Sequence, residues 1–556
     1  MVYEDFIWWD DRGKYTSPVA SAIVYKEGDY AVAKVWNEQW GRWSRIAKST
    51  DHASVIQSAI DEVYNRYGGG KVFISEGEYT INTEITPKSN IILTGDKPTL
   101  KHYSGNCIHG IDISNVVISN LKIVDAAPDQ HTELGGLTNG ILIESIDTPV
   151  ENIMILNNEV AHSVREGIHL NNVLSKSSAT DNYGLKNIII AGNYIHDLTT
   201  GTIGTDGNGI GVHRKSDGVI IENNIIENTI STGILVGSGS EFNYNKNVYI
   251  GRNIIRNTKR YGIDLSGLYG AIIHSNYIYN DDSIIDENTY GILVESATTT
   301  KPSYHVNIVE NVIDGAGPYA IYVYSNVNGV VVSHNKTMRV LNPTEIGARH
   351  IVAPGQNNII THNEIDGSND GSLVLGILAG DYSIIANNII KNTTYNGIEV
   401  FSHCRVYGNY ISGCQRYGIH IVDHSYSIIY GNFIDDVPAD FYGIFEGGTS
   451  DYNIIENNDV SQITTGGKIK TVGANTIVRR NIGYLTENSG TATITAGNTS
   501  VTVNHGLAST PSKVLVTPLS DPGDRYYVTN ITDTSFDIVI ATAPSADVIF
   551  SWYAEV

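Results

Sequence analysis

The segments GVIIENNII at 218–226 and NVYIGRNII at 247–255 contain the pattern that decides the fold. Each has an alternating apolar stretch, an Asn and a second short apolar stretch, and a Gly-Ile-x-Val sequence follows after a variable loop. The unit recurs from about residue 115 to 482, and such internal repetition predicts stacked units rather than one compact core. The Asn residues of the units are Asn158, Asn193, Asn224, Asn253, Asn276, Asn311, Asn335, Asn363, Asn388, Asn409, Asn432, Asn458 and Asn481.

The second half of each unit predicts a short strand, because alternate residues are apolar. Short strands that repeat about every 27 residues, with no helical period between them, favour a parallel β-helix over a sandwich or a propeller. Asn suits the tight turns because it tolerates left-handed backbone geometry, and stacked amides can hydrogen-bond from coil to coil. The sequence therefore predicts an all-β solenoid of about 13 coils.

The segments on either side of the repeats predict caps and small domains. Residues 1–48 form a Trp-rich piece with a β-hairpin, and its aromatic rings either pack a small cap or offer a stacking surface. Residues 49–485 form the β-helix domain, which opens with an amphipathic helix after Asp51 that ends at 68–70. Residues 486–556 alternate strictly and predict a small β-sandwich, for which trimerisation, carbohydrate binding and capping are all open.

Composition excludes several classes of protein and partner. Charged residues make up 17% of the chain, and 36 Lys and Arg against 59 Asp and Glu give a net charge of −23, which disfavours nucleic acid as a partner. No apolar run reaches a membrane span, and the first residues lack a signal-peptide pattern. The three cysteines, Cys107, Cys404 and Cys414, match neither a disulfide framework nor a zinc site.

The start of the repeat region carries a resemblance to a known superfamily. The sequence SVIQSAIDEVYNRYGGG at 54–70 is followed by Gly77-Glu78-Tyr79. A helix, a Gly-rich stop and a strand with Gly-x-Tyr resemble the opening of the pectate-lyase-like β-helix superfamily. The resemblance covers roughly residues 50–485 and implies a right-handed parallel β-helix. It does not choose a function, because the superfamily includes lyases, epimerases, hydrolases and phage tailspikes.

Candidate chemistry lies on the outward positions of Gly-Ile-x-Val. The Ile and Val point inward, so the x residue and the residue after Val form ladders on the outer face. His169 and His213 stand on adjacent coils of these ladders, and Gly211 leaves space beside them. Two outward His residues near Arg165 and Asp206 weigh as much for a functional site as for chance, whereas a single exposed His favours chance.

The charge distribution points to the same coils. Residues 165–260 contain ten Lys or Arg and eight Asp or Glu, for a net charge of +2. Residues 261–338 contain two basic and eight acidic residues, for a net charge of −6. A basic region in an acidic protein favours an acidic polysaccharide as the substrate.

The reaction that such a site favours is removal of a proton next to a uronate carboxylate. Arg214, Arg165 or Lys215 would neutralise the carboxylate, and a neutral His would take the carbon-5 proton. Reprotonation of the opposite face would make the enzyme an epimerase, and cleavage of the neighbouring bond would make it a lyase.

A second, distant resemblance is to mannuronan carbon-5 epimerases and alginate lyases, which carry a Tyr-Gly-x-Asp-Pro-His rung. Tyr261-Gly262-Ile263-Asp264 matches the Tyr and the Asp, whereas Leu265-Ser266 replace Pro-His. The segment 166–171 occupies an early coil and has His169 where that family has Asp. The predicted catalytic residues are His169, His213, Arg214, Asp206, Tyr261 and Asp264, and the predicted substrate-binding residues are Arg165, Glu166, Asn171, His131, Lys215, Glu295 and Tyr322.

Two other functions stay open. Asp264 and Glu295 lie one coil and two ladder positions apart, roughly 8 Å, a separation typical of an inverting glycoside hydrolase. Tyr322 and Tyr324 on the next coil would form a sugar platform, as in a tailspike-like depolymerase. Alternatively, the chain is a fibre that binds a glycan without catalysis.

Metal use, assembly and location complete the expectations. The acidic loop with Asp281, Asp282, Asp286 and Glu287 could hold calcium, although the pattern favours a solvated loop. We expect a monomer or a homotrimer that does not insert into a membrane. A polysaccharide substrate implies an extracellular or virion-associated protein.

Overall fold

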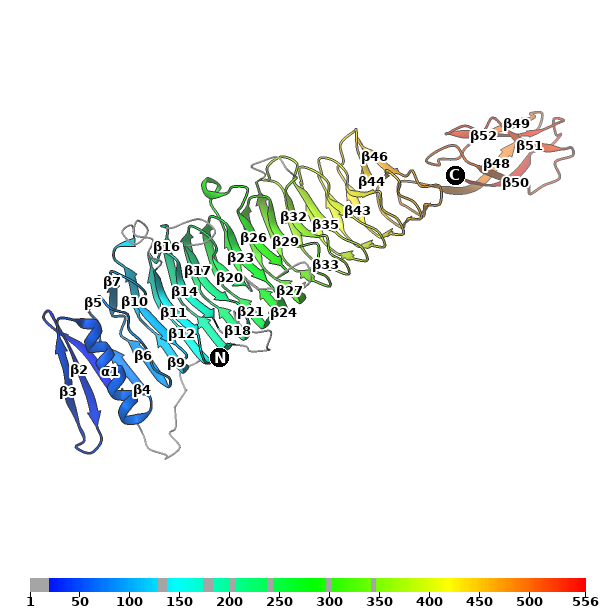
Figure 1. Cartoon of the computed structure of the whole chain (residues 1–556). Helices are drawn as coiled ribbons and strands as arrows, with labels where there is room; N and C mark the ends of the chain where they lie inside the picture. Colours follow the sequence, from blue (N-terminus) through cyan, green and yellow to red (C-terminus); the bar gives the residue numbers. More distant parts are fainter. Residues whose placement is uncertain are drawn as a thin grey trace. The chain divides into compact units, whose positions relative to one another are not determined.

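The computed structural model of the chain describes residues 20–128, 138–173, 184–200, 207–237, 244–296, 303–341 and 347–556. The chain divides into two compact units, residues 1–355 and 356–556. Figure 1 shows the course of the chain. None of the helices in the described ranges is long and apolar enough to cross a membrane.

The first unit opens with an antiparallel sheet and one helix. β1 (Ala22–Glu27), β2 (Tyr30–Asn37) and β3 (Arg42–Ser49) pair in order, and the turn between β1 and β2 uses Gly28 in the left-handed region. The helix α1 (His52–Tyr67) begins where the Asp51 side chain accepts a hydrogen bond from the Ser54 N–H, and it ends at Gly68 with φ 72°. β1 also pairs in parallel with β4, so this opening segment extends the solenoid.

Three parallel sheets follow in the first unit, one for each face of the coil. The strands of sheet A are β4 (Gly70–Ile74), β6 (Ile91–Gly95), β9 (Ser114–Ser119), β12 (Val150–Leu156), β15 (Leu185–Ala191), β18 (Ser216–Glu222), β21 (Asn245–Gly251), β24 (Leu268–His274), β27 (Tyr304–Val309) and β30 (Val331–Ser333). The strands of sheet B are β5 (Glu78–Ile81), β7 (Thr99–His102), β10 (Lys122–Asp125), β13 (Glu159–Ala161), β16 (Tyr194–Leu198), β19 (Ile225–Thr229), β22 (Ile254–Thr258), β25 (Tyr277–Tyr279), β28 (Val312–Ala316) and β31 (Lys336–Val340). The strands of sheet C are β8 (Ile108–Ile111), β11 (Asn139–Ser145), β14 (Glu166–Asn172), β17 (Asn208–His213), β20 (Ile234–Gly237), β23 (Tyr261–Ser266), β26 (Tyr290–Glu295), β29 (Tyr319–Val323) and β32 (Arg349–Ala353).

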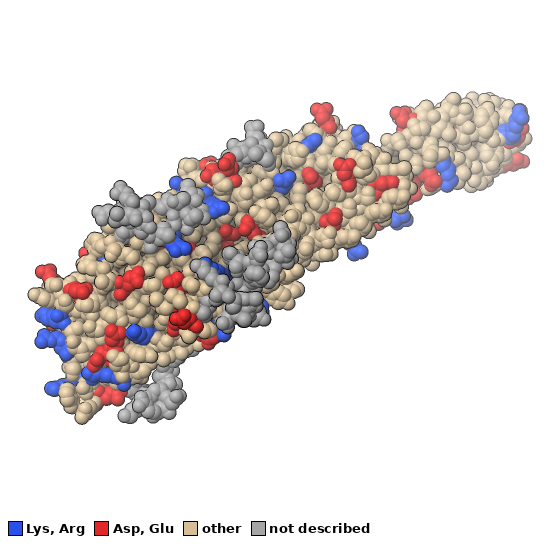
Figure 2. Space-filling model, in the orientation of Figure 1, with Lys and Arg blue, Asp and Glu red and all other residues tan. Residues whose placement is uncertain are grey.

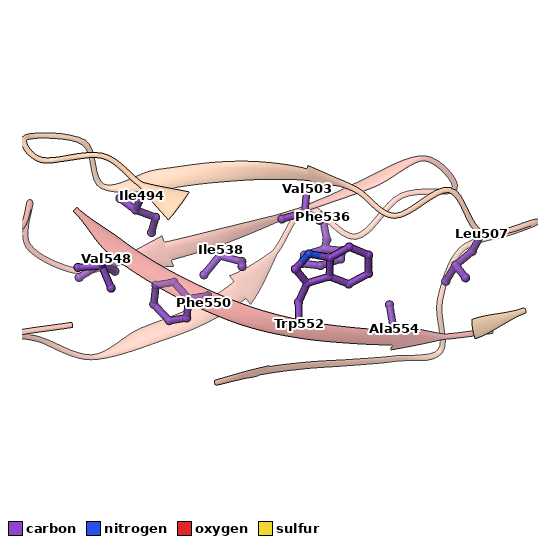
Figure 3. Close-up of a cluster of buried hydrophobic side chains, with 10 residues drawn as sticks. Ile494, Val503, Leu507, Phe536, Ile538, Val548, Phe550, Trp552 and Ala554 are labelled. Carbon is purple, nitrogen blue, oxygen red and sulfur yellow. The ribbon is translucent and has the colours of Figure 1, made fainter. Parts of the chain in front are cut away.

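The second unit contains coils of the same kind and then a different domain. Its parallel strands are β33 (Ile359–Thr361), β34 (Glu364–Asp366), β35 (Leu375–Ala379), β36 (Ile384–Ala386), β37 (Ile389–Lys391), β38 (Ile398–Val400), β39 (Arg405–Tyr407), β40 (Tyr410–Ser412), β41 (Ile419–Val422), β42 (Ile428–Tyr430), β43 (Phe433–Asp435), β44 (Tyr442–Gly447), β45 (Ile454–Glu456), β46 (Gly467–Lys470) and β47 (Ile477–Arg479). Two antiparallel three-stranded sheets end the chain, β48 (Glu487–Ile494) with β53 (Val548–Glu555) and β50 (Lys513–Pro518), and β49 (Ser500–Asn504) with β52 (Ser535–Ile540) and β51 (Tyr526–Thr529). Phe536, Phe550 and Trp552 fill the core of this terminal domain (Figure 3).

Buried Asn side chains connect successive coils. In the first unit, Asn224 Nδ2 donates to Asn253 Oδ1 at 3.0 Å, and Asn253 Nδ2 donates to Asn276 Oδ1 at 2.9 Å. The predicted amide stacking is therefore confirmed, but its assignment to the left-handed turn position was wrong. The residue before each of these Asn takes that conformation, as Asn223 does with φ 55° and Arg252 with φ 56°, whereas the Asn of the ladder is buried. Each ladder amide thus replaces backbone partners that the turn leaves unpaired inside the coil.

Candidate active site on the outer face of sheet C

The register of sheet C confirms the two predicted ladders within the first unit. The Cα partners of the first ladder run His169, Gly211, Leu235, Asp264, Leu293 and Tyr322. In the second ladder Glu144 pairs with Asn171, Asn171 with His213 and His213 with Gly237. Ser266 pairs with Glu295 on later strands of the same sheet. The Ile and Val residues between these positions are fully buried, so the ladders form the outer face of the sheet.

Glu166, His169 and His213 converge on one point of this face, and we call them the histidine cluster. Glu166 Oε1 lies 2.6 Å from His213 Nε2, and Glu166 Oε2 lies 3.7 Å from His169 Nδ1. The two imidazole centroids are 4.7 Å apart. Gly211 lies beneath them, but the space that its missing side chain leaves is filled by the Glu166 carboxylate. A Cβ at this position would lie only 1.9 Å from Glu166 Oε2.

Burial and charge act in opposite directions on the pKa of Glu166. Burial alone would raise it, but the nearby His169 and His213 lower it to about 2. Burial lowers the pKa of His169 to about 4, although Glu166 opposes the change. At neutral pH the cluster therefore contains an ionised carboxylate and a neutral His169. The side chain of His169 is only 2% exposed, whereas that of His213 is 27% exposed.

Neighbouring polar side chains hold the histidine cluster in place. Asn208 Nδ2 donates to Glu166 Oε1 at 3.3 Å, and the Asn139 side-chain oxygen lies 3.2 Å from His169 Nδ1. Asn171 was predicted to bind substrate, but its Nδ2 donates to Glu144 Oε1 at 3.0 Å within the same face.

A further histidine–carboxylate contact beside the same ladder was missed from the sequence. His109 Nδ1 lies 2.8 Å from Glu84 Oε2, and His109 Nε2 lies 3.1 Å from Glu144 Oε2. The hydrogen bond from His109 lowers the pKa of Glu84 to about 2, and the same contact raises the pKa of His109. The signal was the ladder itself, because His109 pairs with Leu142, which pairs with His169, so His109 stands two coils before His169.

Asp264 and Glu295 form the second chemical centre of the face, which we call the carboxylate pair. The pKa of Asp264 is raised to about 7, first by burial and then by the charge of Glu295, while Arg260 and His213 act in the opposite direction. Its side chain is half-buried. Asp264 pairs with Leu293, two residues before Glu295, which confirms the offset of one coil and two positions. At neutral pH Asp264 holds a proton for much of the time.

Five tyrosines flank the carboxylate pair, and we call them the tyrosine group. The ring centroids of Tyr319 and Tyr322 are 4.6 Å apart in a stacked arrangement, and those of Tyr322 and Tyr324 are 5.0 Å apart. Tyr324 is 38% exposed and donates a hydrogen bond to Glu295. The Arg260 guanidinium lies 4.7 Å from the centre of the Tyr261 ring. The members of the group are Tyr261, Tyr290, Tyr319, Tyr322 and Tyr324.

The remaining predicted residues have different outcomes. Arg165 and Arg214 are half-buried, and the Arg214 Nη1 donates to the Asn172 carbonyl at 3.3 Å. Lys215 was predicted to bind substrate, but this residue, which directly precedes β18, is only 3% exposed. This expectation is corrected, since a buried ammonium cannot reach a polymer on the outer face. Asp206 and His131 lie outside the described residues.

The acidic side chains of the loop considered for calcium contact other groups of the protein. Asp282 forms an ion pair with Arg339, and Asp281 accepts a hydrogen bond from Tyr279 at 2.9 Å. The Asp286 carboxylate accepts from the Asn288 N–H within the loop. Among the described residues, the acids of this loop do not bring three candidate ligands together, whereas the histidine cluster does.

Comparisons with known proteins agree with this architecture. A family model for rhamnogalacturonase A/epimerase, pectate lyase-like, matches residues 45–293, and a model for the right handed beta helix region matches residues 301–460. The chain has a right-handed parallel β-helix fold. No curated protein matches it.

Solved structures are similar at low sequence identity. The bacteriophage phi29 gene product 12 N-terminal fragment is 14% identical, with 78% of each chain covered and a TM-score of 0.56. The mannuronan C-5 epimerase AlgE6 A-module of Azotobacter vinelandii is 14% identical over 77% of this chain and 94% of its own, with a TM-score of 0.33. The tailspike gp61 of Pseudomonas phage phi297 is 10% identical over 91% and 92%, with a TM-score of 0.42. At these identities the likeness concerns the fold alone, and the TM-score supports it for the phi29 protein.

Proposed function

We propose that this protein is a glycoside hydrolase that cleaves a polysaccharide bound along the outer face of sheet C. The observation that carries the proposal is the carboxylate pair, in which Asp264 has a pKa near 7 beside the second acid Glu295. A carboxylic acid that keeps its proton at neutral pH can donate it to a leaving sugar oxygen, and a nearby carboxylate can activate water.

The roles within the pair follow from these environments. Asp264 donates its proton to the glycosidic oxygen as the carbon–oxygen bond breaks, and Glu295 takes a proton from the water that attacks the anomeric carbon. The register separates the two Cα atoms by one coil and two residues, roughly 8 Å, and carboxyl groups held at a similar separation leave room for that water. This separation favours inversion of configuration at the anomeric carbon.

The surroundings of the pair suit an extended sugar chain. The tyrosine group supplies rings at coil spacing, and Tyr322 and Tyr324 flank Glu295. Aromatic rings with a polar edge bind the apolar faces of sugars and hydrogen-bond their hydroxyl groups. Arg165 and Arg260 directly precede β14 and β23, Arg214 directly follows β17, and these cations at the borders of sheet C favour a glycan that carries carboxylates.

Proton abstraction at carbon 5 is the competing reaction. His169 is an unsuitable base because it is buried and its side chain is 2% exposed. His213 remains the candidate, since Glu166 orients its ring through the 2.6 Å contact. A third possibility, a glycan-binding fibre without catalysis, would use the tyrosine group alone.

One set of assays separates the three functions. The full chain is incubated with alginate, polymannuronate, polygalacturonate and neutral bacterial polysaccharides. We expect new reducing ends without absorbance from unsaturated sugars, and proton NMR shows the configuration of the first product. Asp264→Asn and Glu295→Gln should lose this activity. Glu399→Gln is the matched control, because Glu399 occupies the corresponding ladder position in the second unit.

The other outcomes contradict the proposal in distinct ways. Unsaturated ends, or inverted carbon-5 configuration without new ends, that depend on His213 and not on Asp264 would support proton abstraction. Binding without any product, lost in Tyr322→Ala, would support the fibre.

Location and assembly follow as parts of the proposal. A polysaccharide substrate places the protein outside the cell or on a virion. Light scattering of the purified chain distinguishes the monomer from the homotrimer.

A further inference from the structure

The histidine cluster contains a buried acceptor that lacks a hydrogen-bond partner. Glu166 is 1% exposed, and its Oε1 accepts from Asn208 and contacts His213. Its Oε2 makes no hydrogen bond and is buried. A buried carboxylate oxygen without a donor is costly, which makes Oε2 a candidate ligand atom.

We propose that Glu166, His169 and His213 bind one zinc-class divalent cation. One ligand atom from each of the three side chains lies within 4.8 Å of the others. The unpartnered Oε2 of Glu166 faces the imidazole of His169, and the site is formed by β14 and β17 on adjacent coils.

The spacing of these atoms suits such an ion. Two ligands about 2.0–2.1 Å from zinc at a tetrahedral angle lie roughly 3.3 Å apart. Glu166 Oε1 lies 2.6 Å from His213 Nε2, and Glu166 Oε2 lies 3.7 Å from His169 Nδ1. These two distances fall on either side of that value. Both contacts differ from it by less than about 1 Å, and the three ligand atoms lie within 4.8 Å of one another. Zinc replaces the proton shared by His213 Nε2 and Glu166 Oε1, and this proton passes to solvent.

The choice of ligands selects the class of metal. Two imidazoles and one carboxylate suit zinc and similar transition metals, whereas calcium and magnesium prefer oxygen ligands. Three protein ligands leave a fourth position for water, as in catalytic zinc sites. His213 is the partly exposed member, so solvent reaches the site at this residue.

The surroundings resemble the outer layer of a metal site. Asn208 donates to the Glu166 carboxylate, and Asn139 contacts the His169 ring. Such partners orient metal ligands. The site also requires glycine at position 211, because a Cβ there would lie 1.9 Å from Glu166 Oε2 and 2.6 Å from His213 Nε2. A glycine at this ladder position allows the three side chains to meet.

The test is zinc binding by the full chain, freed of metal with a chelator. Competition with a chromophoric chelator measures the affinity, and mass spectrometry of the dialysed protein measures the stoichiometry. We expect one Zn²⁺ per chain, with at least 100-fold weaker binding in His169→Ala and His213→Ala. A cobalt-loaded sample should show the intense visible bands of a four-coordinate ion, and these should be absent from both variants.

Two further variants separate a metal site from a mere hydrogen-bonded pair. Gly211→Ala keeps every ligand but displaces the Glu166 carboxylate, so zinc binding should fall. Gly237→Ala is its control, since a Cβ there would come no closer than 3.3 Å to Ser266 Oγ. His109→Ala is the matched control for histidine loss, because His109 is on sheet C and also contacts two glutamates, Glu84 and Glu144.

The outcomes are decisive and independent of the hydrolase proposal. Circular dichroism confirms the fold of each variant before zinc is added. Absence of stoichiometric zinc from the folded wild-type chain, or zinc binding unchanged in His213→Ala, overturns the metal site. Asp264→Asn should bind zinc normally, so failure of the hydrolase proposal leaves this result intact.

Discussion

The histidine cluster and the carboxylate pair lie on the same face of sheet C, yet their carboxyl groups behave in opposite ways. Glu166 is more deeply buried than Asp264, but its pKa falls to about 2, whereas that of Asp264 rises to about 7. Two imidazoles surround Glu166, and another carboxylate stands near Asp264. Burial opposes ionisation at both sites, so the identity of the neighbour decides the protonation state.

This difference in protonation suits the two regions to different chemistry. The histidine cluster presents an anion and ring nitrogens, which suit a metal ion. The carboxylate pair presents a proton donor beside a proton acceptor, which suits hydrolysis. A repeating fold can support both, because each coil adds one outward residue to the same ladder.

The largest expected effect concerns catalysis by the carboxylate pair. Asp264→Asn removes the proton donor but keeps the shape of the side chain, so kcat should fall about 10²- to 10⁴-fold. In the wild type the activity should decrease as pH rises through about 7, because Asp264 then loses its proton. Glu295, Arg260, His213 and Tyr261 are the charged or titratable groups that influence it. A pH–rate profile measures the change, and undiminished activity in Asp264→Asn would contradict the assignment.

The next effect is on stability at the histidine cluster. Glu166→Gln should lower the free energy of unfolding by roughly 2–4 kcal/mol at pH 7. Because the native pKa of Glu166 is below its ordinary value of 4.5, its contribution is present above that pH and is lost as pH falls toward about 2.

Denaturant titrations at several pH values measure this loss. Glu151→Gln is the control, since Glu151 pairs with Lys186 at the surface and should change stability by no more than about 0.5 kcal/mol. Equal losses in the two variants would show that the histidines do not stabilise the Glu166 anion.

A smaller effect of opposite sign is expected for Asp264. Its native pKa is raised above the ordinary value of 3.8, so its relative contribution is intact below that pH and is lost as pH rises through about 7. Asp264→Asn should therefore stabilise the protein at pH 8, by roughly 1–3 kcal/mol, and have little effect at pH 4. Thermal unfolding at both pH values tests this; destabilisation at pH 8 would mean that Asp264 is ionised and well paired.

The smallest expected effect concerns substrate binding. Tyr322→Leu removes a ring that stacks on Tyr319 but leaves the carboxylate pair intact. KM should rise roughly 3- to 10-fold, while kcat changes little, because an aromatic contact contributes about 0.5–1.5 kcal/mol. Tyr410→Leu, on β40 in the second unit, serves as the control. A fall in kcat without a change in KM would place Tyr322 in the chemistry instead.

The sequence predicted the fold and the ladders well, because both depend on local alternation and repetition. The offset of one coil and two ladder positions between Asp264 and Glu295 could be counted directly in the sequence, and the structure confirms it. The burial of each side chain, in contrast, could not be predicted from the spacing of residues in the sequence. His169 and Lys215 share the local pattern of exposed residues, but packing against neighbouring coils and a turn between strands bury them. Likewise, Glu84 is far from His109 in the sequence, and only the coil brings them into contact.

The most direct test of the account is the titration of Asp264 itself. Carbon-13 NMR of protein labelled at the aspartate carboxyl carbon, with Asp264→Asn to assign the resonance, reports its protonation at each pH. The account predicts a midpoint near pH 7. A midpoint near 4, the ordinary value for an exposed aspartate, would remove the proton donor and with it the proposed hydrolase mechanism.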